Sequence, residues 1–108
     1  MSDLELERDL VNLCRQAATA MACYIELISQ RGGKNSGTTV GAPDGHVYVA
    51  GKCIPVEFKV AKGRLTPRQI ANQQLREEHG VHTFVIRTLD EFVGVVNAAR
   101  KSGKGRRV

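Results

Sequence analysis

Apolar side chains recur at intervals of three and four residues near the beginning of the chain, as they do on one face of a helix. These positions are Leu6, Leu10, Leu13, Cys14, Ala17 and Met21. Ser2 and Glu5 have the separation of a capping box, so we predict a first helix that begins at Ser2. Residues 23–28 fit either a continuation of this helix or a first strand, because no Gly or Pro decides between them.

Glycine and small polar residues replace this pattern over residues 30–45, which predicts a long loop. A loop of this length in a small domain is usually functional or disordered. Two short strand patterns follow, over residues 46–50 and 54–60, with Gly51 and Lys52 between them. We therefore predict a β-hairpin in this part of the chain.

The second strand of this hairpin carries its charged residues on one face. Side chains alternate along a strand, so Glu57 and Lys59 share a face and lie about 6.6 Å apart along the chain. The opposite face is apolar and consists of Val56, Phe58 and Val60. Asp44 stands at the start of the neighbouring strand, and the hairpin is expected to bring it near Glu57.

The rest of the chain predicts a helix, a strand and a last helix. Thr66 begins the first of these helices with Pro67 at its first position, and the helix runs to Glu78. Residues 81–87 form a third strand of the sheet, and the last helix covers residues 88–99. This order of elements predicts an α/β (α+β) fold with a central mixed β-sheet flanked by helices.

A chain of 108 residues fits a single domain, which we place at residues 1–99, before a mobile basic tail at residues 100–108. With 42% hydrophobic and 25% charged residues, the composition is that of a globular protein. No apolar run approaches the ~20 residues of a membrane span, and the acidic beginning does not resemble a signal peptide. We therefore expect a cytoplasmic protein without a membrane partner, and three reduced cysteines.

The charge of the chain favours an anionic partner. The net charge is +5 and the pI is near 9.5, and neutralising DNA phosphates releases counterions. A hard divalent cation assists the hydrolysis of a phosphodiester, and carboxylate oxygens are the ligands that such a cation prefers. Asp44 and Glu57 are candidate ligands of Mg²⁺, together with the backbone carbonyl of Phe58. Lys59 would reach the same space and orient the attacking water or balance charge on the phosphate.

Three segments carry a resemblance to a known family: residues 41–44 (GAPD), 56–59 (VEFK) and 63–69 (GRLTPRQ). In this order they resemble the virus-type replication-repair nuclease (VRR-NUC) domain, a branch of the PD-(D/E)XK nucleases, over about residues 5–97. The resemblance implies a restriction-endonuclease-like core, a requirement for Mg²⁺ or Mn²⁺, and a stand-alone, phage-type nuclease of a bacterial or phage-infected cytoplasm. It also implies a homodimer similar to Holliday-junction resolvases.

The resemblance implies a role for individual residues. Asp44 and Glu57 would bind the metal, Lys59 would be the catalytic lysine, and Gln69 would contact the site from its helix. An acidic residue of the first helix also belongs to the pattern, and Glu7 fits it best; its rivals are Glu5 and Glu26. Asn35 and Ser36 would lie in a loop that touches the DNA backbone. Independently of the resemblance, Lys34, Arg64 and Arg68 are expected beside the site, where they would contact phosphates.

Two of these residues have simpler explanations. Gln69 is also the third position of a capping box that begins at Thr66, and Glu7 suits the positive end of a helix dipole.

Two functions also compete with the leading interpretation, which is an endonuclease for branched or flapped DNA in replication or repair. The first is a dedicated Holliday-junction resolvase, and the second is a non-catalytic nucleic-acid-binding module.

Overall fold

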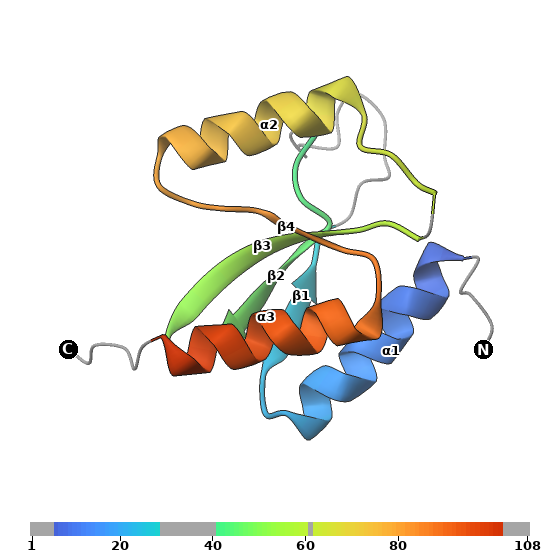
Figure 1. Cartoon of the computed structure of the whole chain (residues 1–108), viewed down its shortest axis with the longest axis vertical. Coiled ribbons are helices and arrows are strands. Elements are labelled where there is room, and N and C mark those ends of the chain that lie inside the picture. Colours follow the sequence, from blue (N-terminus) through green and yellow to red (C-terminus); the bar gives the residue numbers. More distant parts are fainter. Residues whose placement is uncertain (1–5, 29–40, 61, 103–108) are drawn as a thin grey trace.

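The computed structural model describes residues 6–28, 41–60 and 62–102. Its elements, in chain order, are α1 (Glu7–Ala20), β1 (Tyr24–Leu27), β2 (Gly45–Val49), β3 (Lys52–Phe58), α2 (Pro67–Glu78), β4 (Phe84–Ile86) and α3 (Leu89–Lys101). The four strands form one sheet in the order β1-β2-β3-β4 (Figure 1). The first three strands are antiparallel neighbours, and β4 runs parallel to β3. The predicted mixed α+β fold is confirmed.

The beginning of the chain differs from the prediction at one point. Helix α1 starts at Glu7, after an extended Leu6, so the prediction of a helix that begins at Ser2 was wrong. Ser2 and Glu5 lie outside the described residues. Ala22 adopts a left-handed backbone conformation (φ 58°), which ends the helical course of the chain. Residues 23–28, for which the sequence allowed either a helix or a strand, therefore contain a strand, β1.

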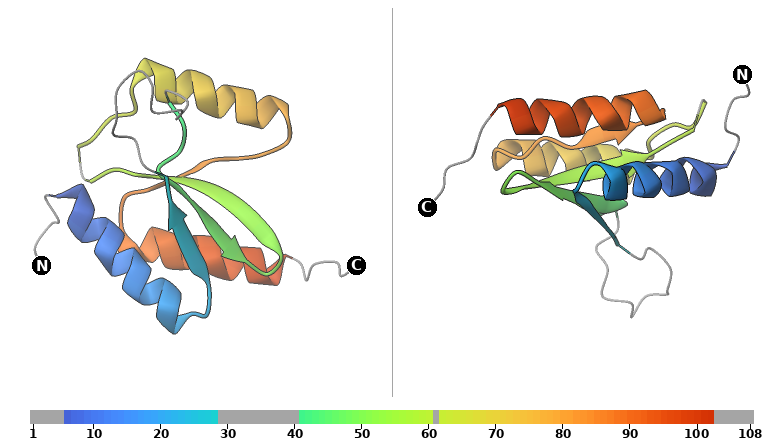
Figure 2. Two further views of the ribbon diagram at one scale, coloured as in Figure 1. Left: turned by 180° about the vertical axis from the view of Figure 1, so that it is seen from behind. Right: turned by 90° about the horizontal axis from the view of Figure 1, so that it is seen from below.

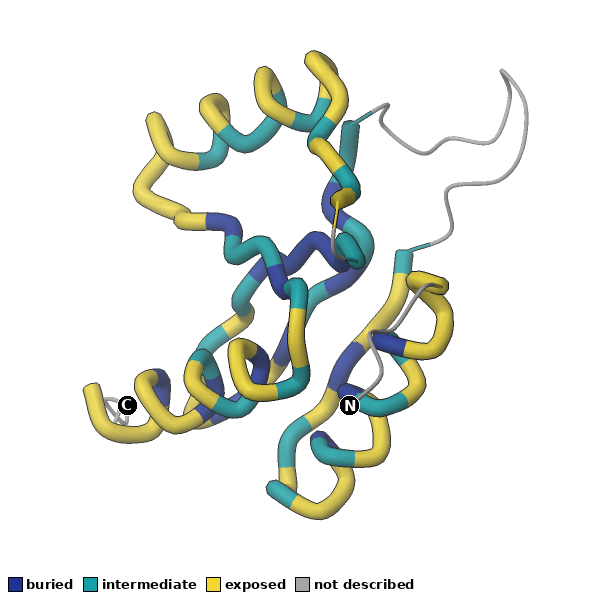
Figure 3. Tube along the Cα trace, turned by 45° about the vertical axis from the view of Figure 1, so that its right-hand side comes forward, coloured by how far each residue is buried: buried dark blue, intermediate teal, exposed yellow. Residues whose placement is uncertain are grey.

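Helices α1 and α3 cover one face of the sheet, and Figures 1 and 2 place them side by side there. Apolar residues of both helices and of the strands form the core between them: Leu10, Cys14, Ala18, Ile25, Val47, Val49, Val56, Phe58, Ile86, Phe92, Val96 and Ala99. Helix α2 stands apart at one end of the sheet, and the described structure buries none of its residues (Figure 3). Much of the opposite sheet face is thus left without a helix.

The hairpin turn consists of Ala50 and Gly51, both with positive φ (54° and 77°), rather than of Gly51 and Lys52. Two consecutive left-handed residues match the twist of a two-residue hairpin. Lys52 instead begins β3, and its Nζ donates hydrogen bonds of 2.8 Å to the Ala99 carbonyl and to Ser102 Oγ. The end of the hairpin is thereby attached to the C-terminus of α3.

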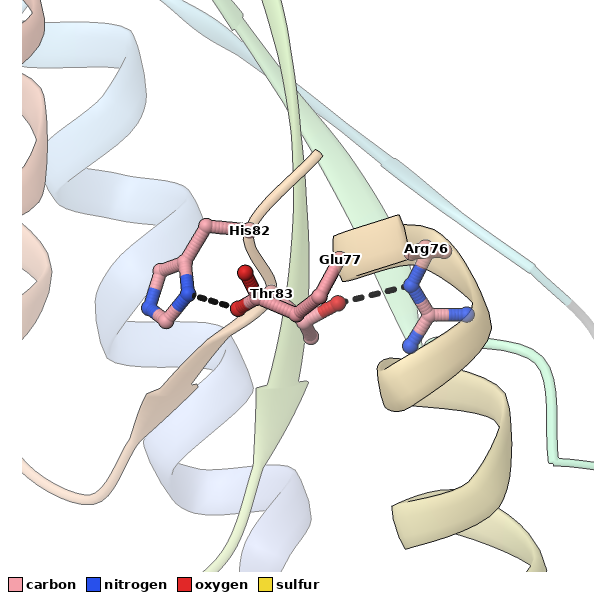
Figure 4. Close-up of polar contacts among 4 residues, drawn as sticks. All are labelled: Arg76, Glu77, His82 and Thr83. Carbon is pink, nitrogen blue, oxygen red and sulfur yellow. Dashed lines mark hydrogen bonds and ion pairs between the residues drawn. The ribbon is translucent and has the colours of Figure 1, made fainter. Parts of the chain in front are cut away.

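Polar contacts hold the C-terminal end of α2 to the segment before β4 (Figure 4). Arg76 Nε donates to Thr83 Oγ1 at 2.6 Å, and His82 contacts the Glu77 carboxylate. Strand β4 is shorter than the predicted strand at residues 81–87, because the residues before it form these contacts instead. Within the part of the chain that the structure describes, no helix has the length and apolarity that crossing a membrane requires.

Candidate active site

Asp44 and Glu57 come from neighbouring strands at the end of the sheet that faces α2. Gly45 pairs with Val56, so Asp44 and Glu57 are the next residues in the antiparallel register. The Asp44 carbonyl accepts from Ile28 N–H at 2.8 Å, and its N–H donates to the Val56 carbonyl at 3.0 Å. Hydrogen bonds to β1 on one side and β3 on the other thus fix the backbone of Asp44.

The Asp44 carboxylate points toward β3. Its Oδ2 accepts a 2.7 Å hydrogen bond from the Phe58 N–H. The Phe58 side chain lies in the core, 1% exposed, so only its backbone can take part in the site. The role of the Phe58 carbonyl as a metal ligand stays a prediction.

Glu57 is a fully buried carboxylate, with an exposed fraction of 0%. Burial and, second, the negative charge of Asp44 raise the pKa of Glu57 to about 8, while Lys59 and Arg76 act in the opposite direction. One carboxylate oxygen, Oε2, has no hydrogen-bond partner among the described residues. A buried carboxylate in this situation binds either a proton or a cation.

Glu7 and Lys59 approach these carboxylates from two other parts of the chain. Glu7 is the first residue of α1; burial and then the charge of Asp44 raise its pKa, and Lys59 lowers it. Lys59 follows β3, and its N–H donates to the Ile86 carbonyl at 3.0 Å. Its ammonium group acts electrostatically on both Glu7 and Glu57. The structure thus brings together the carboxylates and the lysine that the sequence singled out.

Glu5 and Glu26 were the other candidates for the N-terminal acid of the site. Glu5 lies outside the described residues. Glu26 is an exposed residue of β1 whose carboxylate accepts a 2.7 Å hydrogen bond from Tyr48 Oη. Among the N-terminal acids that the structure describes, Glu7 is therefore the one in electrostatic contact with Asp44.

Gln69 makes both of the contacts that the sequence suggested for it. Its Oε1 accepts from Thr66 N–H at 2.9 Å, and Thr66 Oγ1 accepts from Gln69 N–H at 3.1 Å, which completes a capping box. Its Nε2 donates to Glu57 Oε1 at 3.3 Å. The two explanations are therefore compatible, because each end of the amide has its own partner.

Two further polar residues of α2, Gln73 and Arg76, were not predicted from the sequence to belong to the site. Gln73 and Arg76 lie four and seven residues after Gln69, on the same face of the helix. Arg76 acts electrostatically on Glu57, and Gln73 Nε2 and Arg76 Nη2 are buried without partners among the described residues. The helical spacing from Gln69 was the available signal. This spacing shows that the three residues share a face of α2, but it does not predict which residues of the sheet that face contacts.

The glycine of the segment 41–44 explains how this segment approaches α2. Gly41 has a φ of 87°, and a Cβ atom there would stand 2.6 Å from the Arg68 carbonyl oxygen. Only glycine therefore permits this close approach. Arg68, in the first turn of α2, and Arg64, before it, are exposed, while Lys34, Asn35 and Ser36 lie outside the described residues.

No protein-family model matches this sequence, and no curated protein matches it. Solved structures do match its fold. One, titled "VRR_NUC domain protein", superimposes with a TM-score of 0.76 and 18% identity, over 94% of this chain and 93% of that chain. Another, titled "VRR_NUC domain", gives a TM-score of 0.67 and 19% identity, over 84% of this chain and 94% of that one. The protein thus has the fold of VRR_NUC domains over most of its length, as the three sequence segments predicted.

Proposed function

We propose that the protein is a metal-dependent DNA endonuclease that hydrolyses phosphodiester bonds. One observation carries the proposal: α1, both strands of the hairpin and α2 direct Glu7, Asp44, Glu57, Lys59 and Gln69 to one end of the sheet. Carboxylates beside a lysine are the groups that cation-assisted phosphate hydrolysis uses. The VRR_NUC titles of the structures that share this fold agree with the proposal.

Mg²⁺ or Mn²⁺ is the cofactor that these donors fit. Asp44 and Glu57 offer hard oxygen ligands, and Glu57 Oε2 has no hydrogen-bond donor among the described residues. No three His, Cys, Asp or Glu side chains within the described ranges are grouped so that they would hold a metal ion. Water, substrate phosphate and the Phe58 carbonyl would therefore complete the coordination shell. The bound cation would neutralise charge on the phosphate and lower the pKa of a bound water.

The remaining residues act on the water and on the ligands. The Lys59 ammonium stabilises charge that develops on the phosphate oxygens and orients the attacking water. Gln69 holds the Glu57 carboxylate through the Nε2–Oε1 hydrogen bond. Glu7 supplies a third carboxylate near Asp44, and because the described side chains do not form a group of three ligands, we assign it the role of accepting a proton of the water.

DNA is the proposed substrate. Arg64 and Arg68 are exposed near the first turn of α2, where they would contact phosphates beside the site, and Lys34, Asn35 and Ser36 would do so from the preceding loop. We propose that branched or flapped DNA is preferred, with a role in replication or repair. We also propose that two copies form a homodimer.

Two alternatives make different predictions. A dedicated Holliday-junction resolvase requires a stable dimer with two symmetric sites, so a protein that sediments as a monomer argues against it and against the proposed homodimer, and cleavage of flaps but not of four-way junctions argues against the resolvase alone. A non-catalytic binding module requires no cation. The presence of Asp44, Glu57 and Lys59 in one site favours catalysis over this module.

The decisive experiment is a cleavage assay on linear duplex, single strand, flap and four-way junction, with Mg²⁺, Mn²⁺ or EDTA. We expect cleavage with the cations and none with EDTA. Asp44→Asn, Glu57→Gln and Lys59→Ala each remove one group and should reduce cleavage strongly.

A matched control is Lys62→Ala, because Lys62 is an exposed lysine three residues after Lys59. It should cleave like the wild type. The site assignment is wrong if Asp44→Asn and Glu57→Gln both retain the wild-type rate. If the wild-type protein binds DNA but cleaves no substrate with either cation, the binding-module alternative replaces the proposal.

A further inference from the structure

Both tyrosines of the chain lie together on the sheet face that α1 and α3 leave open. Tyr24 of β1 pairs with Tyr48 of β2, and their rings stack with centroids 5.9 Å apart and an interplanar angle of 20°. They are 61% and 38% exposed, whereas Phe58 and Phe92 are buried in the core. His46 lies beside Tyr48 with ring centroids 6.3 Å apart, and these three residues form what we call the aromatic strip.

The aromatic strip leads toward the candidate active site. Alternation along β2 places Tyr48 and His46 on one face, and Asp44, directly before the strand, continues the same row. Four residues of a strand span roughly 13 Å. This length corresponds to about four stacked nucleotides at roughly 3.4 Å each. A DNA strand whose phosphate lies at Asp44 can therefore reach Tyr48 with its next few bases.

The tyrosine rings are held in place while their surfaces stay accessible. Tyr48 Oη donates to Glu26 Oε1 at 2.7 Å, and this hydrogen bond is the main cause of a raised Tyr48 pKa. A groove of about 590 Å³ between this sheet face and α2 borders the strip at His46, and Pro55, Leu75 and Val81 line it further on. The strip is thus both prepositioned and open on the side of α2.

We propose that the aromatic strip stacks the unpaired bases of a DNA strand that enters the active site. The proposal rests on the nuclease function proposed above, and it identifies the substrate as DNA with unpaired bases beside the scissile phosphate. Every base has a π-face, so stacking on tyrosine tolerates any sequence, whereas the base faces of a duplex are already occupied. The net charge of +5 favours nucleic acid as a partner of the chain, and the row from Tyr48 to Asp44 connects this surface to the proposed site of cleavage.

Tyrosine fluorescence tests the proposal, because the chain has no tryptophan and its only two tyrosines belong to the strip. The full chain is titrated in EDTA, where no cleavage is expected, with a 15-nucleotide oligo-dT and with a duplex of the same length. We expect the single strand to quench the emission and the duplex to leave it nearly unchanged.

Substitutions identify the groups responsible. Tyr24→Ala should weaken binding of the single strand by about 5- to 150-fold, since stacking contributes about 1–3 kcal/mol per base. Tyr24→Phe keeps the ring and should bind like the wild type. Leu27→Ala removes an exposed apolar side chain of the same strand, 44% exposed, and serves as the control for lost surface area. Circular dichroism checks that each variant is folded.

Two results would overturn the proposal. One is wild-type affinity of Tyr24→Ala for the single strand. The other is a wild-type dimer that Tyr24→Ala converts to a monomer with unchanged DNA affinity, which would make the strip a contact between copies. Binding is measured without metal, so its outcome is independent of cleavage. If Tyr24→Ala loses binding while the wild-type protein cleaves no DNA, base stacking on the aromatic strip is supported and the proposed nuclease function is rejected.

Discussion

At the scale of single residues, the buried Glu57 carboxylate dominates the chemistry of the site. Its pKa is raised from an ordinary 4.5 to about 8, so the folded protein binds this proton more tightly than the unfolded chain does. The metal-free protein should therefore be most stable below pH 4.5, as far as Glu57 is concerned, and lose stability as the pH rises toward about 8. Thermal unfolding in EDTA between pH 4.5 and 9 measures this loss.

Glu57→Gln is the matched variant, since its amide does not titrate. It should remove a large part of the stability loss across this pH range. Mg²⁺ at pH 8.5 should raise the melting temperature of the wild type more than that of the variant, because a ligand that binds the folded state stabilises it. Equal pH profiles for the two proteins would contradict the assigned pKa.

The sequence could predict the neighbourhood of Asp44, Glu57 and Lys59, because alternation along a strand and pairing in a hairpin follow from local patterns. It could not predict the contacts of Gln73 and Arg76. Those depend on where α2 lies relative to the sheet, and the described structure buries no residue of this helix. Without a buried apolar stripe, the hydrophobic pattern of α2 has no face that indicates its neighbour.

At the scale of elements, the N-terminus of α2 combines a structural and a functional role that substitutions can separate. Thr66→Ala removes the acceptor for the Gln69 N–H and should cost about 1 kcal/mol of stability, with cleavage near the wild-type rate. Gln69→Ala also removes the hydrogen bond to Glu57, and cleavage should fall about 10- to 100-fold. Chemical denaturation and single-turnover cleavage measure the two effects. Equal cleavage rates would leave Gln69 a capping residue only.

The hairpin turn offers a second pair of substitutions, with opposite expected signs. Ala50 has a φ of 54°, where a Cβ atom is unfavourable, so Ala50→Gly should stabilise the protein by up to about 1 kcal/mol. Gly51→Ala should destabilise it by about 1 kcal/mol through the backbone alone, because no described atom lies within 4 Å of the added Cβ. Urea denaturation of both variants tests the pair. A loss of stability in Ala50→Gly would show that the greater conformational entropy of glycine in the unfolded chain outweighs the relief of backbone strain at position 50.

The order of the elements was predictable, and their boundaries less so. The apolar run at residues 23–28 fits both a helix and a strand, and pairing with β2 decides for the strand. The helix between β3 and β4 is long enough for the crossover that a parallel pair needs, and the two strands do pair in parallel. The start of α1 was misplaced because the spacing of Ser2 and Glu5 in the sequence is that of a capping box, whereas the helix begins at Glu7 after an extended Leu6.

At the scale of the whole molecule, the basic charge should determine how tightly DNA binds. Lys104, Arg106 and Arg107 contribute three of the chain's sixteen basic residues and follow the last helix. Each phosphate contact contributes about −0.9 to the slope of log K against log salt concentration for duplex DNA. Replacing all three by Gln should make this slope shallower by up to about 3, and affinity at low salt should fall accordingly.

Fluorescence anisotropy with a labelled duplex, between 50 and 300 mM NaCl in EDTA, measures the slope. The triple variant keeps the length of the chain and leaves Asp44 and Glu57 intact, so its cleavage at saturating DNA should equal that of the wild type. Lys104, Arg106 and Arg107 are therefore expected to affect how much DNA is bound and not how fast the bound DNA is cut. An unchanged slope would mean that the phosphates are contacted elsewhere, with exposed Arg64 and Arg68 beside the site as the next residues to replace.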